Sequence, residues 1–66
     1  MDYKKVNTLM KYKGFSKLRL SRETGIAPQD ISSVLNGKRY CYPGWKRRIA
    51  EALGVTEDDI SDSEMK

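Results

Sequence analysis

The stretch ETGIAPQDISSVLNGKR, residues 23–39, carries the signals for the end of a helix, a tight turn and a second short helix. Gly25 is expected to end the first helix at a positive φ, where glycine has no Cβ penalty. Pro28 suits the first position of the second helix, because its fixed φ is helical and no backbone N–H is lost there. Three apolar residues at i, i+3 and i+4 predict the buried stripe of that helix: Ile31, Val34 and Leu35. The second helix is therefore predicted to run from Pro28 to about Leu35 or Asn36.

The helix before the turn is predicted to span about Lys17 to Thr24. Ser16 is a candidate N-cap, because its hydroxyl can accept from backbone N–H groups of the first turn, and Phe15 is placed to pack on the helix as a staple. Small residues on the inward face would let another helix approach closely. The residues expected to turn inward are Leu20, Ser21 and Thr24, with Ile26 entering the core just after the turn. The apolar Leu18 falls outside this face.

Apolar spacing predicts two further helices, one on each side of this central segment. The first runs from Asp2 to Lys13 and stops at Gly14. Its apolar face is expected to carry Val6, Leu9 and Met10. The other runs from Trp45 to Leu53 and stops at Gly54. Its apolar face is expected to carry Trp45, Ile49, Ala52 and Leu53.

The remaining segments are predicted to be connections, one last helical turn and a tail. Residues 38–44 are expected to form a loop that ends in a Pro-Gly turn. Thr56 is expected to cap a short turn whose first residues are acidic, with Ile60 packing back onto the core. Residues 61–66 are expected to form a frayed acidic tail.

Length and composition limit what the chain can be. A chain of 66 residues makes one small domain, and such a domain buries only about 60% of the surface that its unfolded chain exposes. With Cys41 as the single cysteine and no histidine, no intrachain disulfide, zinc site or cofactor is expected. There is no apolar run of about 18 residues and no signal-peptide core after Met1, so neither membrane spanning nor secretion is expected.

Charge is distributed unevenly along the chain. Residues 1–50 carry twelve Lys or Arg and three Asp or Glu, whereas residues 51–66 carry one and six. The net charge of +4 therefore combines a strongly basic body with a short acidic end. A basic body of this kind indicates an anionic partner. Two explanations remain open from composition alone: a nucleic-acid partner, or the charged surface that any small soluble domain needs.

The sequence does not favour an enzyme. It has no histidine, and no base lies near Cys41 in sequence to activate its thiol. A calcium loop would need alternating ligands and a central glycine, which the acidic segment lacks. A solvated face and tail is the expected explanation for its acids: Glu57, Asp58, Asp59, Asp62 and Glu64.

The helix at 17–24, the turn at Gly25 and the helix at 28–36 form a helix-turn-helix pattern. In this pattern the chain resembles the phage repressor and Cro-type (C1-type) helix-turn-helix family over roughly residues 15–60. The matching features occur in one order: Leu20, Ser21, Gly25, Ile26, Ile31 and Val34, then LNGKR at 35–39 and IAEALGV at 49–55. The resemblance implies an all-α bundle of about five helices, with one helix-turn-helix domain over residues 1–60. It also implies that the helix at 28–36 enters the major groove of double-stranded DNA.

The outward side of that helix is the candidate base-reading face. With the apolar stripe turned inward, Gln29 and Ser33 point most directly away, flanked by Ser32 and Asn36. A merely solvated polar face is the alternative, and the basic surroundings favour DNA over it. The resemblance places four residues at base-facing positions: Pro28, Gln29, Ser32 and Ser33. Glutamine is also suited to a bidentate contact with adenine.

The expected phosphate contacts surround this face. The resemblance implies that the DNA backbone is held by Lys17, Asn36, Lys38 and Arg39. Gly44 and Trp45 open a helix whose free N–H groups are placed to receive a phosphate. Asp30 brings a negative charge near the DNA unless it faces sideways. Since Gln29 is the one long-armed reader, modest specificity is expected, with help from dimer spacing and DNA shape.

The function that these expectations indicate is a transcriptional regulator of the repressor or Cro kind, from a prokaryote or phage. It is expected to be cytoplasmic, to associate with the nucleoid and to bind as a homodimer to a two-fold symmetric operator. The dimer contact is expected in the segment from Val55, and no small-molecule ligand is evident. Two alternatives remain: a protein-binding module, such as an antitoxin or a polymerase-binding protein, and a DNA-binding accessory factor in recombination or excision.

Overall fold

The computed structural model describes residues 1–61, so the predicted tail lies outside the described residues except for Ser61. The described part contains four α-helices, one short 3-10 helix and no strand, which confirms the predicted all-α class. The elements are α1 (Tyr3–Lys13), α2 (Lys17–Thr24), α3 (Pro28–Leu35), α4 (Pro43–Leu53) and η1 (Glu57–Ile60). None of the described helices combines the length and the apolar content that crossing a bilayer requires.

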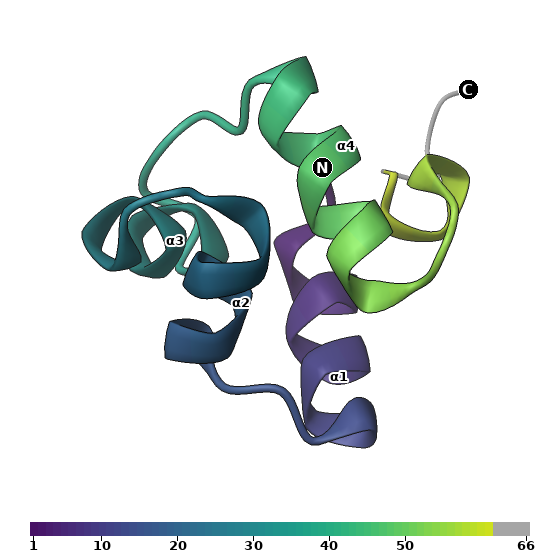
Figure 1. Cartoon of the computed structure of the whole chain (residues 1–66). Coiled ribbons are helices and arrows are strands. Elements are labelled where there is room, and N and C mark those ends of the chain that lie inside the picture. Colours follow the sequence, from purple (N-terminus) through teal and green to yellow (C-terminus); the bar gives the residue numbers. More distant parts are fainter. Residues whose placement is uncertain (62–66) are drawn as a thin grey trace.

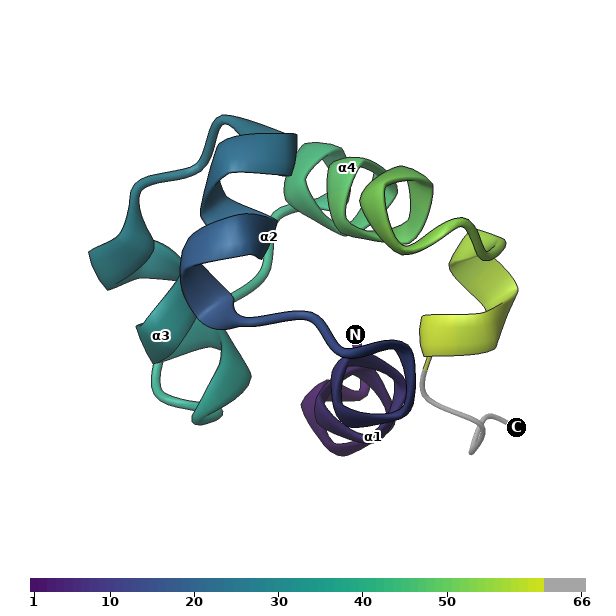
Figure 2. The same ribbon diagram turned by 60° about the horizontal axis from the view of Figure 1, so that its bottom comes forward.

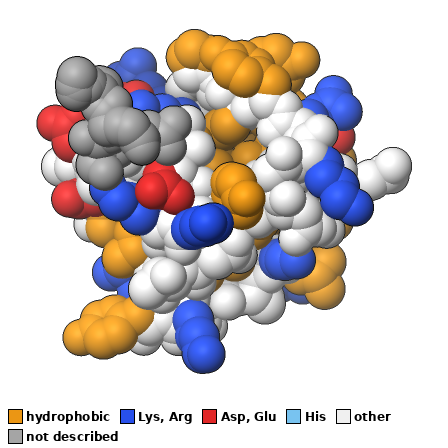
Figure 3. Space-filling model, turned by 180° about the vertical axis from the view of Figure 1, so that it is seen from behind, with side chains coloured by type: hydrophobic (Ala, Val, Ile, Leu, Met, Phe, Trp, Pro, Cys, Tyr) orange, Lys and Arg blue, Asp and Glu red, His pale blue; other side chains and the backbone are white. Residues whose placement is uncertain are grey.

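The helices pack around one centre. Helix α2 lies between α3 and α4, and α1 closes the other side of the core (Figures 1 and 2). The short η1 packs on α1 and on α4. Seen from behind, most of the acidic side chains gather beside the C-terminal segment, while Lys and Arg side chains are spread over the rest of that face (Figure 3). Some Lys and Arg side chains also border the acidic group in this view (Figure 3).

The predicted helix ends are confirmed where local capping decides them. Asp2 caps α1, and its carboxylate accepts from the N–H groups of Lys4 and Lys5 at 3.0 and 3.3 Å. The Ser16 hydroxyl caps α2 by accepting from the N–H of Arg19 at 3.0 Å. Each cap satisfies N–H groups that have no partner within the helix, so each stabilises the helix start.

The turn between α2 and α3 is held by buried hydroxyl groups. Gly25 adopts φ +76°, as predicted. The Thr24 hydroxyl donates to the carbonyl of Leu20 at 2.7 Å and accepts from the N–H of Ile26 at 3.2 Å. The Ser21 hydroxyl donates to the carbonyl of Ile26. Ser21 and Thr24 thus do more than leave room for another helix, because they also pair the polar backbone groups of a buried turn.

The start of α4 was predicted wrongly. The helix begins at Pro43 and not at Trp45, because the Pro-Gly pair forms the first turn of the helix and does not end the loop. Proline fits this position as well as it fits a β-turn, since its φ suits both and its missing N–H would have no helical partner. The buried face also differs from the expected one. It consists of Ile49, Ala50 and Leu53, while Trp45 and Ala52 are only partly buried.

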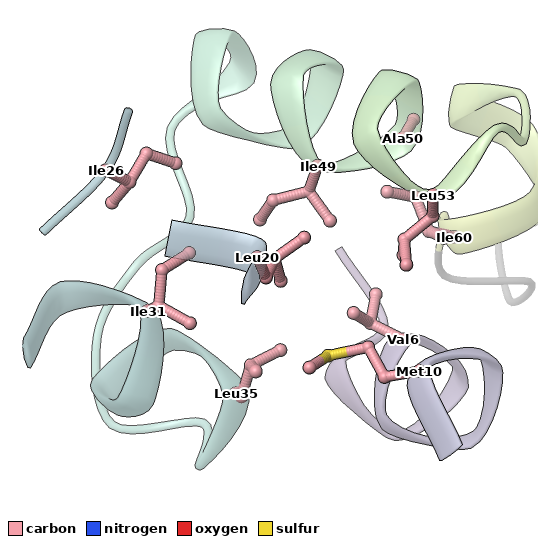
Figure 4. Packing of buried hydrophobic residues seen from close by; sticks show 10 residues of the cluster. All are labelled: Val6, Met10, Leu20, Ile26, Ile31, Leu35, Ile49, Ala50, Leu53 and Ile60. Atoms are coloured by element: carbon pink, nitrogen blue, oxygen red, sulfur yellow. The ribbon is translucent and has the colours of Figure 1, made fainter. Parts of the chain in front are cut away.

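One apolar cluster joins all five elements. Leu20 of α2 lies at its centre, with side chains from the other elements pointing toward it (Figure 4). The buried members are Val6, Met10, Leu20, Ile26, Ile31, Leu35, Ile49, Ala50, Leu53 and Ile60. Leu9 is partly buried, and Leu18 is exposed, as its place outside the predicted face requires. Burial of about ten apolar side chains, each contributing about 1.5–3 kcal/mol, supplies the main stabilisation of so small a domain.

Both ends of the described chain meet at this cluster. Ile60 is fully buried, and its carbonyl accepts from the N–H of Asp2 at 2.8 Å. Thr56 and Asp59 form a capping box at the start of η1, in which each side chain accepts from the other residue's N–H. The Lys5 ammonium donates to the carbonyl of Ser61 at 3.2 Å. The predicted last turn is therefore confirmed, and it is fastened to α1.

Candidate nucleic-acid interface

Helix α3 lies at the outer edge of the molecule in both ribbon views (Figures 1 and 2). Its apolar stripe is almost completely buried against the rest of the domain at Ile31, Val34 and Leu35. Because one side of a helix is fixed to the core, the opposite side faces outward. This arrangement gives α3 a defined orientation and leaves its polar side accessible.

The four residues predicted to face bases differ in how far they are accessible. Pro28 and Gln29 are exposed, whereas Ser32 and Ser33 are partly buried. Residues three and four positions apart are neighbours on a helix, so Gln29 lies beside both serines. Gln29 is thus the long and exposed member of the group, and the short serine hydroxyls lie closer to the body of the domain.

The end of α3 is a Schellman motif. Gly37 has φ +73°, its N–H donates to the carbonyl of Val34 at 3.1 Å, and the N–H of Lys38 donates to the carbonyl of Ser33 at 2.9 Å. This pattern of two bonds from a left-handed residue and its successor ends a helix sharply. The chain therefore turns at Gly37, and the exposed Lys38 and Arg39 follow directly after the helix that carries Gln29.

Two residues of α1 hold the end of α3, and the sequence did not single out either of them. The Asn7 side-chain amide donates to the carbonyl of Leu35 and to the carbonyl of Tyr3, both at 2.9 Å. The Tyr3 ring lies against the backbone of Gly37. Asn7 sits beside Val6 at the edge of the apolar face, but nothing in sequence links it to a carbonyl 28 residues away.

Arg39 makes contacts within the protein itself. Its Nη1 lies 3.7 Å from Oδ1 of Asp30, and its guanidinium carbon lies 5.7 Å from the centroid of the Trp45 ring. Asp30 thus turns sideways toward the loop that follows α3. The ion pair is loose and half-exposed, so it leaves Arg39 able to reach another anion.

Aromatic residues line the loop between α3 and α4. The rings of Tyr40 and Tyr42 lie edge to face at 5.4 Å, and those of Tyr42 and Trp45 do so at 4.9 Å. Trp45 is partly buried against the core, whereas both tyrosines are exposed. In Figure 3 an apolar group occupies the end of the molecule at which α4 begins.

The first turn of α4 offers free backbone N–H groups. The N–H of Lys46 donates to the carbonyl of Tyr42 at 3.0 Å, and no side chain caps this helix. The N–H groups of Gly44 and Trp45, which precede Lys46, have no acceptor within the helix. Both residues thus stand inside the first turn, where the helix dipole favours an anion.

The other two predicted phosphate contacts are also on the surface. Lys17 is the first residue of α2 and follows the Ser16 cap, and its side chain is exposed. Asn36 is the exposed C-cap residue of α3, and its N–H donates to the carbonyl of Ser32 at 3.0 Å. Both side chains are accessible to a ligand.

Three further features concern possible ligands: clusters of metal-ligating side chains, the Cys41 thiol and a groove. Within residues 1–61, no group of three or more His, Cys, Asp or Glu side chains is arranged to hold a metal ion. Burial raises the pKa of the partly buried Cys41 thiol, whose sulfur lies 3.7 Å from that of Met1. A groove of about 570 Å³ lies apart from α3 and is lined by Lys4, Lys5, Thr8, Leu9, Val55 and Asp59.

A protein-family model matches nearly the whole chain. Residues 5–64 match the Cro/C1-type HTH DNA-binding domain, so the matched segment contains α2, the turn and α3. No curated protein and no solved structure matches the chain. The matched family and the arrangement of α2, the turn and α3 agree with the resemblance seen in the sequence. The chain belongs to the Cro/C1-type helix-turn-helix DNA-binding domain family.

Proposed function

We propose that this protein is a sequence-specific transcriptional regulator of the repressor or Cro kind, which inserts α3 into the major groove of double-stranded DNA. The observation that carries the proposal is the orientation of α3, which has one side buried in the core and a polar side exposed at the molecular edge. An α-helix with such an exposed side fits the width of the major groove. Membership of a DNA-binding family supports the same partner.

In this role the four outward residues of α3 read bases. Gln29 has the length and the paired donor and acceptor that a bidentate contact with adenine needs. Ser32 and Ser33 are shorter and partly buried, so they reach only base edges that lie close to the helix. Pro28 offers an apolar surface of the kind that contacts the methyl group of thymine.

The surrounding residues hold the DNA backbone. Phosphate contacts are assigned to the side chains of Lys17, Asn36, Lys38 and Arg39 and to the N–H groups of Gly44 and Trp45. The two loop cations directly follow α3, and the free N–H groups open the next helix. Such contacts supply affinity and register without reading sequence, so base discrimination is left to α3.

Two copies are proposed to bind a two-fold symmetric operator, with half-sites about 34 Å apart. The groove that Leu9 and Val55 line is the proposed contact between them. Its lining combines apolar side chains with Lys4, Lys5 and Asp59, so a second copy would meet groups of both charges there. Residues 1–60 then form a single helix-turn-helix domain of a nucleoid-associated protein.

Binding to duplex DNA across a salt series tests the function. A labelled random-sequence duplex is titrated with the protein at several salt concentrations between about 50 and 200 mM, and anisotropy reports the affinity. The logarithm of the binding constant is expected to fall linearly with the logarithm of the salt concentration, because each neutralised phosphate releases counterions. An affinity that does not change with salt would exclude DNA binding through phosphates. Selecting duplexes from a random pool then shows whether the preferred sites are symmetric.

A protein-binding module is the second candidate, and the exposed Tyr40 and Tyr42 favour it. Aromatic side chains are enriched at protein interfaces, and these two form an exposed edge-to-face pair. The salt series separates the two candidates, since a protein partner held by aromatic contacts does not require counterion release. An accessory role in recombination or excision would instead appear as strong bending of the bound duplex.

A further inference from the structure

We propose that Asp30 is a positioning residue that restrains Arg39 and so weakens the contact of Arg39 with the DNA backbone. Asp30 and Arg39 together are named the latch. The latch rests on the proposed function, because it acts only where Arg39 meets DNA. It gives the carboxylate of Asp30 a partner within the protein, so that Asp30 and a phosphate compete for the same cation.

The geometry of the latch comes from the two ends of α3. Asp30 lies in the first turn of the helix, and Arg39 lies two residues beyond Gly37, where the chain turns back. Their side chains are 33% and 48% exposed, and the oxygen and nitrogen are 3.7 Å apart. The pair therefore connects the start of the reading helix with the loop that follows it.

A second contact restricts the same guanidinium. The guanidinium carbon of Arg39 lies 5.7 Å from the centroid of the Trp45 ring, within the range of a cation–π interaction. Trp45 is itself partly buried and packs on the core, so the ring is a fixed partner. Arg39 thus has two partners within the protein, a carboxylate on α3 and a ring on α4, and both contacts are weak enough for a phosphate to compete with them.

These contacts put the phosphate and Asp30 in competition for one cation. When Arg39 turns to a phosphate, Asp30 loses its partner and is left facing the polyanion. This loss is the same for every duplex whose phosphate takes Arg39, whether or not α3 also reads its bases. The latch therefore lowers affinity for random DNA and for the operator by a similar factor.

The chain contains a matched control for this effect. Among the described residues, the other ion pair joins Arg47 and Glu51 on α4, also at 3.7 Å, with side chains 72% and 70% exposed. Asp30→Asn and Glu51→Gln each raise the net charge by one. A general effect of charge on DNA binding appears in both variants, whereas release of Arg39 appears only in the first.

The test compares affinities for a random duplex and for the best selected duplex at one salt concentration. Asp30→Asn is expected to raise random-duplex affinity about two- to fivefold beyond the effect of Glu51→Gln, as expected for an exposed ion pair. Affinity for the selected duplex should rise by a similar factor, because Arg39 meets the backbone of both duplexes. Asp30→Glu, which keeps the charge, should restore behaviour close to that of the unmodified protein.

A double variant decides whether the effect passes through Arg39. In an Arg39→Gln background, Asp30→Asn should raise the affinity for the random duplex no more than Glu51→Gln does. An equal gain from the two acid substitutions, or a gain from Asp30→Asn that persists without Arg39, overturns the latch alone. If the unmodified protein shows no salt-dependent duplex binding, both the latch and the proposed function are overturned. Circular dichroism confirms that each variant compared is folded.

Discussion

The ring of Tyr3 lies so close to Gly37 that a Cβ at position 37 would be 2.7 Å from Cε1 and 2.8 Å from Cζ of that ring. Gly37 also has φ +73°, which L-residues with a side chain rarely adopt. The Tyr3 ring of α1 therefore lies at the point where α3 ends. Glycine is required here for its backbone conformation and for its lack of a side chain.

Gly37→Ala is expected to destabilise the fold by about 2–3 kcal/mol, combining the left-handed conformation with the clash against Tyr3. Gly14→Ala is the matched control, because Gly14 has the same φ of +73° but nothing within 4 Å of a built Cβ. Gly14→Ala should lower the free energy of unfolding only by the cost of the left-handed conformation, about 1 kcal/mol. Urea unfolding measures both losses, and equal losses would show that the Tyr3 contact contributes nothing.

Asn7→Ala is expected to lower stability by about 1–2 kcal/mol, because it removes a part-buried donor from the carbonyl of Leu35. Thr8→Ala provides the control, since the Thr8 hydroxyl bonds only to Lys4 within the same helix and is exposed. Thermal unfolding compares the two variants. If Asn7→Ala is no more harmful than Thr8→Ala, the bridge between α1 and α3 does not stabilise the domain.

Gln29→Ala is expected to cost about 1–3 kcal/mol on the best selected duplex while leaving random-duplex affinity nearly unchanged. Lys38→Ala should instead weaken binding to every sequence and lower the salt slope by about one unit, as loss of one phosphate contact does. The measurement is the affinity for both duplexes across the salt series. Uniform weakening by Gln29→Ala would remove Gln29 from the base-reading residues.

Cys41 should make stability depend on alkaline pH. Burial raises the pKa of its thiol above the ordinary value of 9.0, so the folded state favours the protonated form. The protonated thiol therefore contributes to the free energy of unfolding. This contribution is fully present below the thiol pKa in the unfolded chain, and it is lost as pH rises through the thiol pKa in the folded state. Urea unfolding at a series of pH values above neutral measures this effect. The free energy of unfolding should fall less with rising pH for Cys41→Ala than for the unmodified protein. If the free energy of unfolding falls equally with pH in both proteins, the Cys41 thiol does not cause the pH dependence.

The helix-turn-helix itself was predictable because local signals decide it. Ser16 begins a helix, Gly25 ends it, and Pro28 begins the next one, and each acts on its immediate neighbours. The start of α4 was not predictable in this way. The Pro-Gly pair at 43–44 satisfies a turn and the first turn of a helix equally well, so only packing of the following residues decides between them.

The candidate site was predictable as a face but not as a set of contacts. The spacing of apolar residues on α3 predicts which side faces outward, but it does not predict that neighbouring side chains partly bury Ser32 and Ser33. The sequence also gave no sign that Asp30 pairs with Arg39 or that Asn7 bonds to Leu35. Such contacts join residues that are distant in sequence, and the packing of the helices alone creates them.

The bond between the N–H of Asp2 and the carbonyl of Ile60 has a consequence for how the protein is made. Ile60 is fully buried and packs η1 against the first helix, so the core is incomplete until both have met. A ribosome synthesises α1, α2, α3 and α4 before it reaches Ile60. Until Ile60 has left the exit tunnel, the nascent chain therefore lacks one buried member of its core and the backbone bond that joins Ile60 to Asp2.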